Sequence, residues 1–560
     1  MTARTANAPA AYVTSAVAQF TGWGDGTALV HGERSMSFRE LLSLTHRTAR
    51  VFRDRGLGRG DGLVLLAANP LEMTAVGLAA HILGICYTPV YASGGARTTE
   101  HILRDAAPSA VVVAGAGPAG TAHRTLEAAR AAGARLLFTL GPCTDPQVTD
   151  PQVTDLLAAA GDQTDDPVPV AAQEDDVARV LYTGGTTGQP KGVAYTFGAL
   201  AAAAGAWAGA APPPGLRFLA MTPMAHAAGA IAFGLLRHGV SVELFDGFDA
   251  GVLLRRVARA SDAGRLVSTY LYPPYLYRLL DHPELPHTDL RGLASLSYGS
   301  APVAPHRLAE TVRLLGPRLR QSYALTEAIA ITGLGPEDHA LAAASRPELF
   351  SSVGRAVPGV TVRITGADGH PLPPGAEGAV EVSGPTVMAG YWQRPDLTEQ
   401  VLRRGRLRTG DLGRLDEDGY LYLTGREKDL VIVDGTNCHP QAVEDVLTAH
   451  PAVRNAAVVG VPDARTGEAL LAVCVPAQDA PADVEDTLRA LVRDALGPAH
   501  VPGRFAFVTD IPTASYGKPD KAALRALYSP DGPAPADPAP TGPTPTGPAP
   551  TGPTPLRSEA

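Results

Sequence analysis

Apolar runs alternate with helix-like stretches along the first part of the chain. Residues 64–67, 87–90 and 110–113 form short, mostly apolar runs, which are typical of strands buried on both faces of a sheet. The intervening segments 73–83 and 101–106 are predicted to be helices. Strands separated by helices in this order predict parallel βαβ units.

Turn signals and patterns predict further elements. A hairpin is expected over residues 28–38 and is followed by a helix. Residues 353–391 are rich in strand patterns with tight turns, and 460–476 predict two strands around a turn. The tandem duplication TDPQVTDPQVTD over 144–155 predicts a loop because it is rich in Pro and Asp. The alanine-rich stretch 198–211 predicts a tightly packed helix.

A loop of three glycines and three threonines, TGGTTG, follows the predicted strand 177–182. Glycines let the backbone approach an anion with its N–H groups exposed, and Lys191 adds a mobile positive charge. This composition predicts a phosphate-binding loop. The Walker A pattern does not fit, because two residues separate Gly188 from Lys191 and Gly192 follows the lysine. A plain glycine-rich turn remains the alternative for this stretch taken alone.

The composition of the chain limits the classes of function. Its 560 residues are enough for several structural units, and 45% are hydrophobic and 18% charged. The formal net charge of −9 argues against a nucleic-acid-binding surface. The four cysteines are far apart without a CxxC pair, which argues against a disulfide framework and a zinc site. Neither an apolar signal core nor a run of the ~18 apolar residues that span a bilayer occurs, so a cytoplasmic location without a membrane partner is expected.

Several motifs follow one another along the chain. They are TGGTTGQPKG over 183–192, SLSYGSAP over 295–302, QSYALTE over 321–327, RTGDLG over 408–413, TGREKD over 424–429 and SYGKPDK over 515–521. Together they resemble the motifs of the adenylate-forming (AMP-binding) enzymes, which include acyl-CoA synthetases, aryl-CoA ligases, luciferases and stand-alone adenylation domains. The resemblance extends from about residue 27 to 527. Two positions depart from the family pattern, since Gly184 replaces a serine and Ala324 replaces a glycine.

The resemblance implies roles for individual residues. Tyr323 would stack on adenine, Thr326 would contact the α-phosphate, and Glu327 would hold Mg²⁺, a hard cation that suits a carboxylate. The residues implied to bind ATP or AMP are Thr183, Gly184, Gly185, Thr186, Thr187, Gly188, Lys191, Gly299, Ser300, Ala301, Tyr323, Asp411 and Arg426. The implied catalytic residues are Lys518, Thr326, Glu327 and the hinge residue Lys428. The residues implied to line the substrate pocket are His226, Gly229, Tyr270 and Tyr298.

The resemblance also implies the architecture. The expected fold class is α/β, with a large N-terminal domain of layered α/β subdomains plus a β-rich subdomain, and a small mobile α+β C-terminal domain. The expected boundaries are 1–424 for the N-terminal adenylation domain and 425–528 for the C-terminal lid domain. Residues 529–560 carry TGPxP-type repeats with too little apolar content to fold, and a disordered Pro-rich tail is expected there.

The implied activity is the ATP- and Mg²⁺-dependent conversion of a carboxylic acid to an acyl-adenylate with release of pyrophosphate. Lys518 would bridge the carboxylate and the α-phosphate, and the C-terminal domain would then rotate for transfer to a thiol, with CoA as the expected co-substrate. Residues 224–228 lack the aspartate that grips the amino group in amino-acid-activating relatives, so an α-amino acid is not expected. Tyr270 and Tyr272 beside small residues favour a fatty or aryl acid.

Several alternatives stay open from the sequence alone. The acceptor is either CoA or a carrier protein, or the enzyme activates nitrite in a diazotase-type reaction on an aryl amine. A nucleotide-binding pseudoenzyme is a third alternative. The presence of all six polar residues of the motifs argues against it, and they are Thr326, Glu327, Asp411, Arg426, Lys428 and Lys518. The Ala- and Pro-rich composition resembles that of actinobacterial ligases of secondary metabolism and antibiotic biosynthesis, and a homodimer is compatible with the sequence. A Cys438–His439 nucleophile pair is a weaker hypothesis, because adjacent residues rarely aim at each other.

Overall fold

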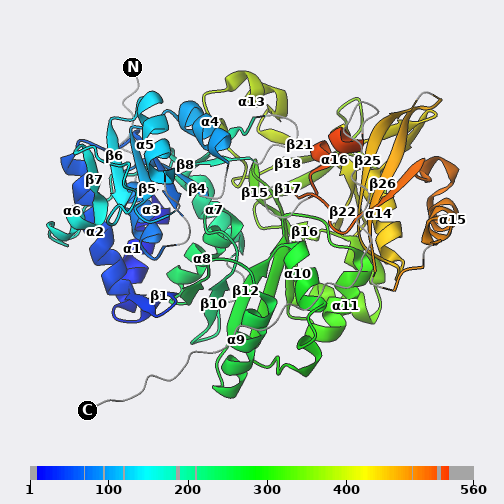
Figure 1. The fold of residues 1–560 in the computed structure, drawn as a ribbon, viewed down its shortest axis with the longest axis horizontal. Helices are drawn as coiled ribbons and strands as arrows, with labels where there is room; N and C mark the ends of the chain where they lie inside the picture. The colour runs from blue at the N-terminus through cyan, green and yellow to red at the C-terminus, as the bar shows by residue number, and fades with distance from the viewer. Residues whose placement is uncertain are drawn as a thin grey trace, which may run out of the picture.

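The chain folds into a large N-terminal part with three β-sheets and a smaller C-terminal part with a fourth (Figure 1). The predicted Pro-rich tail, 529–560, lies outside the residues whose structure is described. The computed structural model describes residues 9–67, 70–91, 95–117, 120–183, 189–207, 211–463, 465–477, 479–481, 483–513 and 519–528.

The first sheet contains the parallel βαβ units that the sequence predicts. Its strands are β3 (Gly62–Ala67), β4 (Cys86–Tyr91), β5 (Ala110–Ala114), β6 (Leu136–Leu140), β7 (Val153–Asp155), β8 (Val177–Tyr182), β9 (Gly192–Thr196) and β19 (Gly390–Tyr391). The helices of this part are α1 (Ala11–Trp23), α2 (Phe38–Asp54), α3 (Glu72–Ile82), α4 (Ala96–Ala106), α5 (Thr121–Ala131) and α6 (Leu156–Gly161). In the order β19-β9-β8-β4-β3-β5-β6-β7, the pairs from β8 to β7 are parallel, whereas β9 and β19 form an antiparallel edge.

The sequence predicts a loop over the whole duplicated segment 144–155, and this prediction is wrong for the end of the segment. Its last three residues form strand β7, which pairs in parallel with β6. A short strand is favoured here because the outer edge of β6 would otherwise leave its backbone groups without partners in a sheet. Asp155 then caps α6, since its side chain accepts hydrogen bonds from the N–H groups of Leu157 and Ala158.

The second sheet packs opposite the first. Its strands are β1 (Thr27–His31), β2 (Arg34–Ser37), β10 (Arg217–Ala220), β11 (Ser241–Leu244), β12 (Val267–Leu271), β13 (Leu293–Gly299), β14 (Leu319–Leu325), β15 (Ala328–Leu334) and β16 (Arg355–Ala356), in the order β16-β15-β14-β13-β12-β10-β11-β1-β2. The helices are α7 (Phe197–Trp207), α8 (Ala227–Arg237), α9 (Ala250–Asp262), α10 (Pro273–Leu280), α11 (Pro305–Leu315) and α12 (Pro336–Ala344). Strands β1 and β2 form the predicted hairpin, and α7 is the predicted alanine-rich helix.

Two smaller sheets complete the fold. The third consists of β17 (Thr361–Thr365), β18 (Gly378–Ser383), β20 (Leu402–Arg403), β21 (Arg406–Leu415) and β22 (Leu421–Arg426), with α13 (Pro395–Val401) beside it. The fourth consists of β23 (Val431–Val433), β24 (Thr436–Cys438), β25 (Val453–Asp463), β26 (Gly467–Pro476) and β27 (Arg504–Phe507), with α14 (Pro440–Ala449), α15 (Val484–Leu496) and α16 (Lys521–Tyr528). The chain passes from the third sheet to the fourth through a single turn of 3₁₀ helix at Glu427–Asp429.

The largest hydrophobic cluster lies between the first and second sheets. It combines side chains of β3 with side chains of α7, α8 and β10, so the two sheets share one core. Smaller clusters cover the outer faces, under α9 to α11 for the second sheet and under α4 and α5 for the first. Within the described part of the chain, no helix is both long and apolar enough to cross a membrane.

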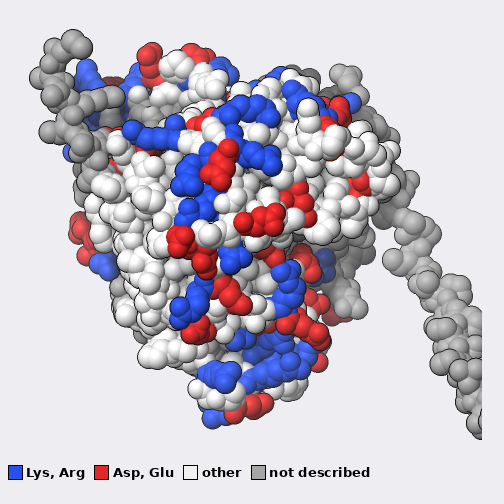
Figure 2. Space-filling view, turned by 90° about the vertical axis from the view of Figure 1, so that its left-hand side faces the viewer, with Lys and Arg blue, Asp and Glu red and all other residues white. Residues whose placement is uncertain are grey.

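Basic and acidic side chains are interleaved on the face shown in Figure 2. Many exposed arginines of the molecule are paired locally, as Arg39 is with Asp25 at 2.7 Å and Arg291 is with Asp289 at 2.6 Å. Exposed pairs of this kind contribute ~0–1 kcal/mol each, so they shape the surface charge more than the stability.

Candidate active site

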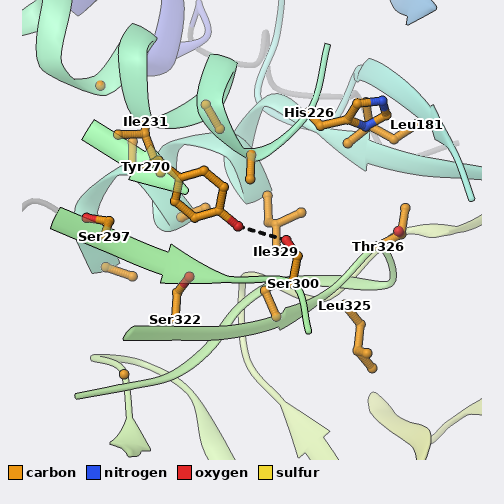
Figure 3. A pocket seen from close by; sticks show the side chains of 18 of the residues that line it. Leu181, His226, Ile231, Tyr270, Ser297, Ser300, Ser322, Leu325, Thr326 and Ile329 are labelled. Carbon is orange, nitrogen blue, oxygen red and sulfur yellow. Dashed lines mark hydrogen bonds between the residues drawn. The ribbon is translucent and has the colours of Figure 1, made fainter. Parts of the chain in front are cut away.

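A cavity of about 1710 Å³ opens between the first and second sheets. Strands β8, β12, β13 and β14 and helix α8 all contribute to its walls. The carboxyl ends of parallel strands are where open α/β sheets place ligand sites. In Figure 3, Ile231, Tyr270 and Ser297 gather at one end of the cavity, and His226 and Thr326 lie at the other. We call the end with Ile231, Tyr270 and Ser297 the acyl pocket.

The predicted phosphate loop begins at the end of β8. Its base is closed by the backbone, because Thr183 N–H donates to the Lys191 carbonyl at 3.0 Å and Lys191 N–H donates to the Thr183 hydroxyl at 3.3 Å. Both residues line the cavity. The tip of the loop lies outside the described residues, which leaves the assignment of these residues a prediction: Gly184, Gly185, Thr186, Thr187 and Gly188.

A chain of contacts connects Lys191 with the predicted metal ligand Glu327. Thr326 and Glu327 occupy the turn between β14 and β15, and both line the cavity. The Tyr391 hydroxyl donates to Glu327 Oε1 at 2.8 Å, and the Lys191 ammonium lies 5.2 Å from the centroid of the Tyr391 ring. Burial, followed by the Glu327 charge, raises the pKa of Tyr391, so this hydroxyl keeps its proton. The sequence predicts no role for Tyr391, and the glycine and two aromatic residues at 390–392 are the signal that could have pointed to it.

A second group of polar residues surrounds Asp411. Its carboxylate is buried and accepts hydrogen bonds from the Tyr323 hydroxyl at 2.6 Å and from Arg426 Nε at 2.8 Å. Burial and then the Asp411 charge hold the pKa of Tyr323 well above its usual range. Arg426 and Lys428 line the cavity next to this group, and burial followed by the Arg426 charge lowers the pKa of Lys428.

Two side chains in the wall of the acyl pocket are joined by a hydrogen bond. Tyr270 and Ser300 place their hydroxyl oxygens 2.8 Å apart, drawn as a dashed line in Figure 3. Ser300 adopts a left-handed backbone with φ of 72°, which turns the chain directly after β13. In Figure 3 His226 lies beside Leu181, away from Tyr270, and burial followed by the charge of Arg179 lowers its pKa to about 4. The imidazole is therefore neutral at physiological pH.

Six of the predicted binding residues that the structure describes are not among those that line the cavity, and they are Gly229, Tyr298, Gly299, Ala301, Tyr323 and Asp411. Tyr298 is fully buried with its hydroxyl 2.9 Å from His339 Nε2, in the core on the opposite face of β13 from Ser297. This placement departs from the expected pocket role, and the reason is the two-residue period of a strand. Gly299 and Ala301 flank Ser300 without facing the cavity, and Gly229 serves the turn into α8, where a Cβ would fall 1.9 Å from a backbone oxygen.

Two further predictions concern Lys518 and the pair Cys438 and His439. Lys518 lies outside the described residues, and its catalytic role stays a prediction. Cys438 and His439 point to different partners, because the Cys438 thiol donates to the Ala499 carbonyl and His439 Nε2 lies 3.3 Å from Glu377 Oε1. Burial also raises the pKa of Cys438, so the arrangement does not support a nucleophile pair.

Comparison with known proteins places this site in a family. The model of the AMP-binding enzyme family matches residues 17–392, and the model of the AMP-binding enzyme C-terminal domain matches residues 442–518. The chain therefore belongs to the AMP-binding enzyme family. The resemblance inferred from the motifs and the expected α/β fold, with a large N-terminal and a small C-terminal part, are confirmed.

Individual relatives cover nearly the whole chain. The medium/long-chain-fatty-acid–CoA ligase FadD8 of Mycobacterium tuberculosis is 33% identical over 512 residues, which cover 89% of this chain and 86% of that protein. A feruloyl-CoA synthase of Amycolatopsis sp is 33% identical over 508 residues, which cover 90% of this chain and 96% of that protein. The structure of the amide bond synthetase McbA from Marinactinospora thermotolerans is similar with a TM-score of 0.82 and 35% identity, covering 92% of this chain and 100% of that chain.

Proposed function

We propose that this enzyme uses ATP to convert a carboxylic acid to an acyl-adenylate and passes the acyl group to the thiol of CoA. The observation that carries this proposal is that one cavity joins polar groups suited to a nucleotide, around Lys191, Glu327 and Arg426, to the acyl pocket. The two curated relatives described above are named as a medium/long-chain-fatty-acid–CoA ligase and a feruloyl-CoA synthase, which supports this reaction class.

The chemistry needs the negative charges of both substrates to be offset. A carboxylate is a poor electrophile until it is joined to a good leaving group, and ATP supplies AMP for this purpose. Lys191 and the phosphate loop would hold the departing pyrophosphate, and Asp411 would accept hydrogen bonds from the ribose. The neutral His226 would separate the nucleotide from the acyl pocket without adding charge.

The Glu327 carboxylate fits the role of a Mg²⁺ ligand. No group of three or more His, Cys, Asp or Glu side chains suited to a metal occurs among the described residues. Mg²⁺ commonly binds through one or two carboxylates together with substrate phosphates and water. Glu327, fixed by Tyr391 at the wall of the cavity, would supply the protein ligand, and the bound ion would offset phosphate charge.

The decisive experiment measures pyrophosphate release with Mg-ATP across fatty acids, aryl acids and nitrite, each with and without CoA. Release with one carboxylic acid, followed by formation of its CoA thioester, is the expected result. Pyrophosphate release with nitrite alone, or an acyl-adenylate that does not react with CoA, would contradict the proposed transfer of the acyl group to CoA. The absence of release with every acid would indicate a nucleotide-binding protein without adenylating activity.

Lys518→Ala separates the two half-reactions. We expect adenylate formation to fall by at least about a hundredfold, because the variant loses the cation that bridges the carboxylate and the α-phosphate. Transfer from a supplied acyl-adenylate to CoA should remain within about threefold of the unaltered enzyme. Lys521→Ala is the matched control, since Lys521 is tied to Glu444 at 2.9 Å. Equal loss of both half-reactions in Lys518→Ala would contradict the assignment.

An amine is the second candidate acceptor. The observation in its favour is the similarity over 92% of this chain to a protein named as an amide bond synthetase. In that case the adenylate would react with an amine and yield an amide without CoA. Mass analysis of the products formed from acid, ATP and a primary amine, with and without CoA, distinguishes the two acceptors.

A further inference from the structure

Arg179 places a positive charge inside the cavity. It lies on β8 four residues before Thr183 and on the same face of the strand as Leu181, and both Arg179 and Leu181 line the cavity. The pairing of β8 with β9 shifts register between Val177 and Arg179, which marks a β-bulge. Bulges are common beside active sites, where they re-aim a side chain. The bulge here lies directly before the arginine.

Arg179 has no paired carboxylate within the described part of the chain. Among the described residues no Asp or Glu oxygen lies within 4 Å of its guanidinium, and its Nε is buried without a hydrogen-bond acceptor. The guanidinium carbon lies 5.6 Å from the centroid of the Tyr87 ring. The other groups that feel its charge are uncharged at neutral pH, and they are Tyr12, His81, Cys86 and His226.

Two other partly buried arginines of this chain show how a carboxylate balances such a charge. Arg426 is bound by Asp411 at 2.8 Å, and Arg256 is bound by Glu243 at 2.8 Å. Taking a guanidinium out of water without a counter-ion is costly, and a cation–π contact offsets only part of that cost. Arg47 also has a buried Nε without a hydrogen-bond partner, but Arg179 differs from it in lining the cavity, where a ligand can supply the counter-ion.

A second polar group in the cavity wall is also unsatisfied. Ser268 is 5% exposed, and its hydroxyl, on β12 of the second sheet, is buried without a hydrogen-bond partner among the described residues. The side chain lines the same cavity as Arg179, from the other sheet. Buried hydroxyls in proteins are nearly always hydrogen-bonded. The cavity thus offers unused hydrogen-bonding capacity from two of its walls, which a ligand with further polar atoms would satisfy.

We propose that Arg179 binds a second carboxylate of the substrate, so that the enzyme activates one end of a dicarboxylic acid and holds the other. This inference rests on the proposed acid-activating function. The planar guanidinium matches a carboxylate through two parallel N–H···O bonds. Because Arg179 and Thr183 are four residues apart on an extended strand, roughly 13 Å of backbone separates them. The second carboxylate would therefore lie on the order of 10 Å from the base of the phosphate loop, which sets the range of chain lengths to test.

The test compares acids that differ only in a terminal carboxylate. Pyrophosphate release is measured with the six-, eight- and ten-carbon straight-chain dicarboxylic acids and with monocarboxylic acids of equal length. For at least one length, the unaltered enzyme should show kcat/KM at least about tenfold higher for the diacid. Arg179→Met should lower this ratio at least about tenfold, and Arg179→Lys should restore part of it.

Ile231→Met is the control within the same cavity. It changes the shape of the acyl pocket but not its charge, so it should alter kcat/KM for both members of a pair by the same factor. A diacid-to-monoacid ratio that is below one in the unaltered enzyme and unchanged in Arg179→Met would overturn the inference, as would an equal effect of Arg179→Met on both acids.

A binding measurement separates this inference from the proposed function. The thermal unfolding of the protein is followed with each acid in the absence of ATP. Stabilisation by the diacid that is lost in Arg179→Met supports the anion site even if no acid releases pyrophosphate. Conversely, pyrophosphate release with monocarboxylic acids alone, without stabilisation by any diacid, upholds the proposed function and overturns the assignment of Arg179.

Discussion

Tyr391 connects two residues that come from distant parts of the sequence. Its hydroxyl holds Glu327, and its ring lies beneath the Lys191 ammonium, so one side chain fixes an anion and a cation at the same wall of the cavity. An uncharged linker suits this position, because it orients both groups without neutralising either. The carboxylate remains able to bind a cation, and the ammonium remains able to bind phosphate.

Tyr391→Phe tests this link, because it removes the hydroxyl and keeps the ring. A hydrogen bond to a charged group contributes about 1.5–3 kcal/mol, so the concentration of Mg²⁺ needed for half-maximal pyrophosphate release should rise roughly tenfold or more. The measurement is a titration of initial rates with Mg²⁺ at saturating ATP.

Tyr422→Phe is the matched control for that substitution. The Tyr422 hydroxyl donates to Asp416 at 3.3 Å, within the core of the second sheet rather than at the cavity. Its Mg²⁺ titration should therefore be unchanged. The same Mg²⁺ dependence in Tyr391→Phe and the unaltered enzyme would show that the Tyr391–Glu327 contact does not position the metal ligand.

At the scale of elements, β13 shows where sequence patterns stop being informative. The strand itself could be predicted, but both of its faces are buried, so hydropathy does not tell which side chains meet the cavity. The structure turns Ser297 to the cavity and Tyr298 to the opposite core. Likewise, the motifs located Glu327, whereas its contact with Tyr391 joins residues 64 positions apart and depends on the packing of β19 against β9.

Helix α14 carries a carboxyl group that faces the N-terminal part. Asp445 interacts with Tyr277 of α10, and Gln441 Nε2 donates to its Oδ1 at 2.9 Å. Burial, reinforced by the nearby Glu444, raises the pKa of Asp445 to about 7. The group is therefore favoured in its neutral form where α14 packs on the N-terminal part.

This raised pKa predicts a pH-dependent stability. In the unfolded chain the carboxyl ionises near its usual pKa of about 4, whereas in the folded chain it stays protonated up to about 7. Its contribution is therefore complete below about pH 4 and is lost as the pH rises to about 7. Asp445→Asn cannot ionise and should be more stable than the unaltered protein at about pH 8 by about 1–2 kcal/mol, relative to their difference at about pH 5.

Thermal unfolding of both proteins at the two pH values measures this effect, since all other titrating groups cancel in the difference. Asp463→Asn is a suitable control because hydrogen bonds to backbone N–H groups lower the pKa of Asp463, so this carboxyl is ionised in both the folded and the unfolded chain at the two pH values, and the difference in stability from the unaltered protein should not change between them. A difference between Asp445→Asn and the unaltered protein that does not change with pH would contradict the neutral carboxyl.

At the scale of the whole molecule, the hydrophobic clusters separate along the chain. Two clusters contain buried residues only from Val431 onward, and the other three contain buried residues only up to Tyr422. Contacts between the two parts include the polar pairing of His439 with Glu377. An apolar core that does not cross residues 423–430 indicates two units that can each fold alone.

A chain that ends after residue 429 tests this separation. We expect it to unfold cooperatively, with far-ultraviolet circular dichroism that matches a folded α/β protein, because its three sheets and their cores are complete. It should still bind ATP but form no adenylate, since it lacks Lys518. A truncated chain that is unfolded under conditions where the full chain is folded would show that the two parts form one cooperative unit.

The spacing of side chains along strand β8 limits the lengths of the acids that the cavity can select. Its side chains alternate, with Arg179 and Leu181 toward the cavity and Val180 and Tyr182 in the core of the opposite face. A charge moved along this strand can therefore stand only at every second residue, in steps of roughly 6.6 Å. An arginine at position 181 instead of 179 would select acids one step shorter, and an arginine at 180 would miss the cavity altogether. Because the backbone repeat of the strand limits where a charged side chain can face the cavity, the length of the preferred substrate would change in discrete steps.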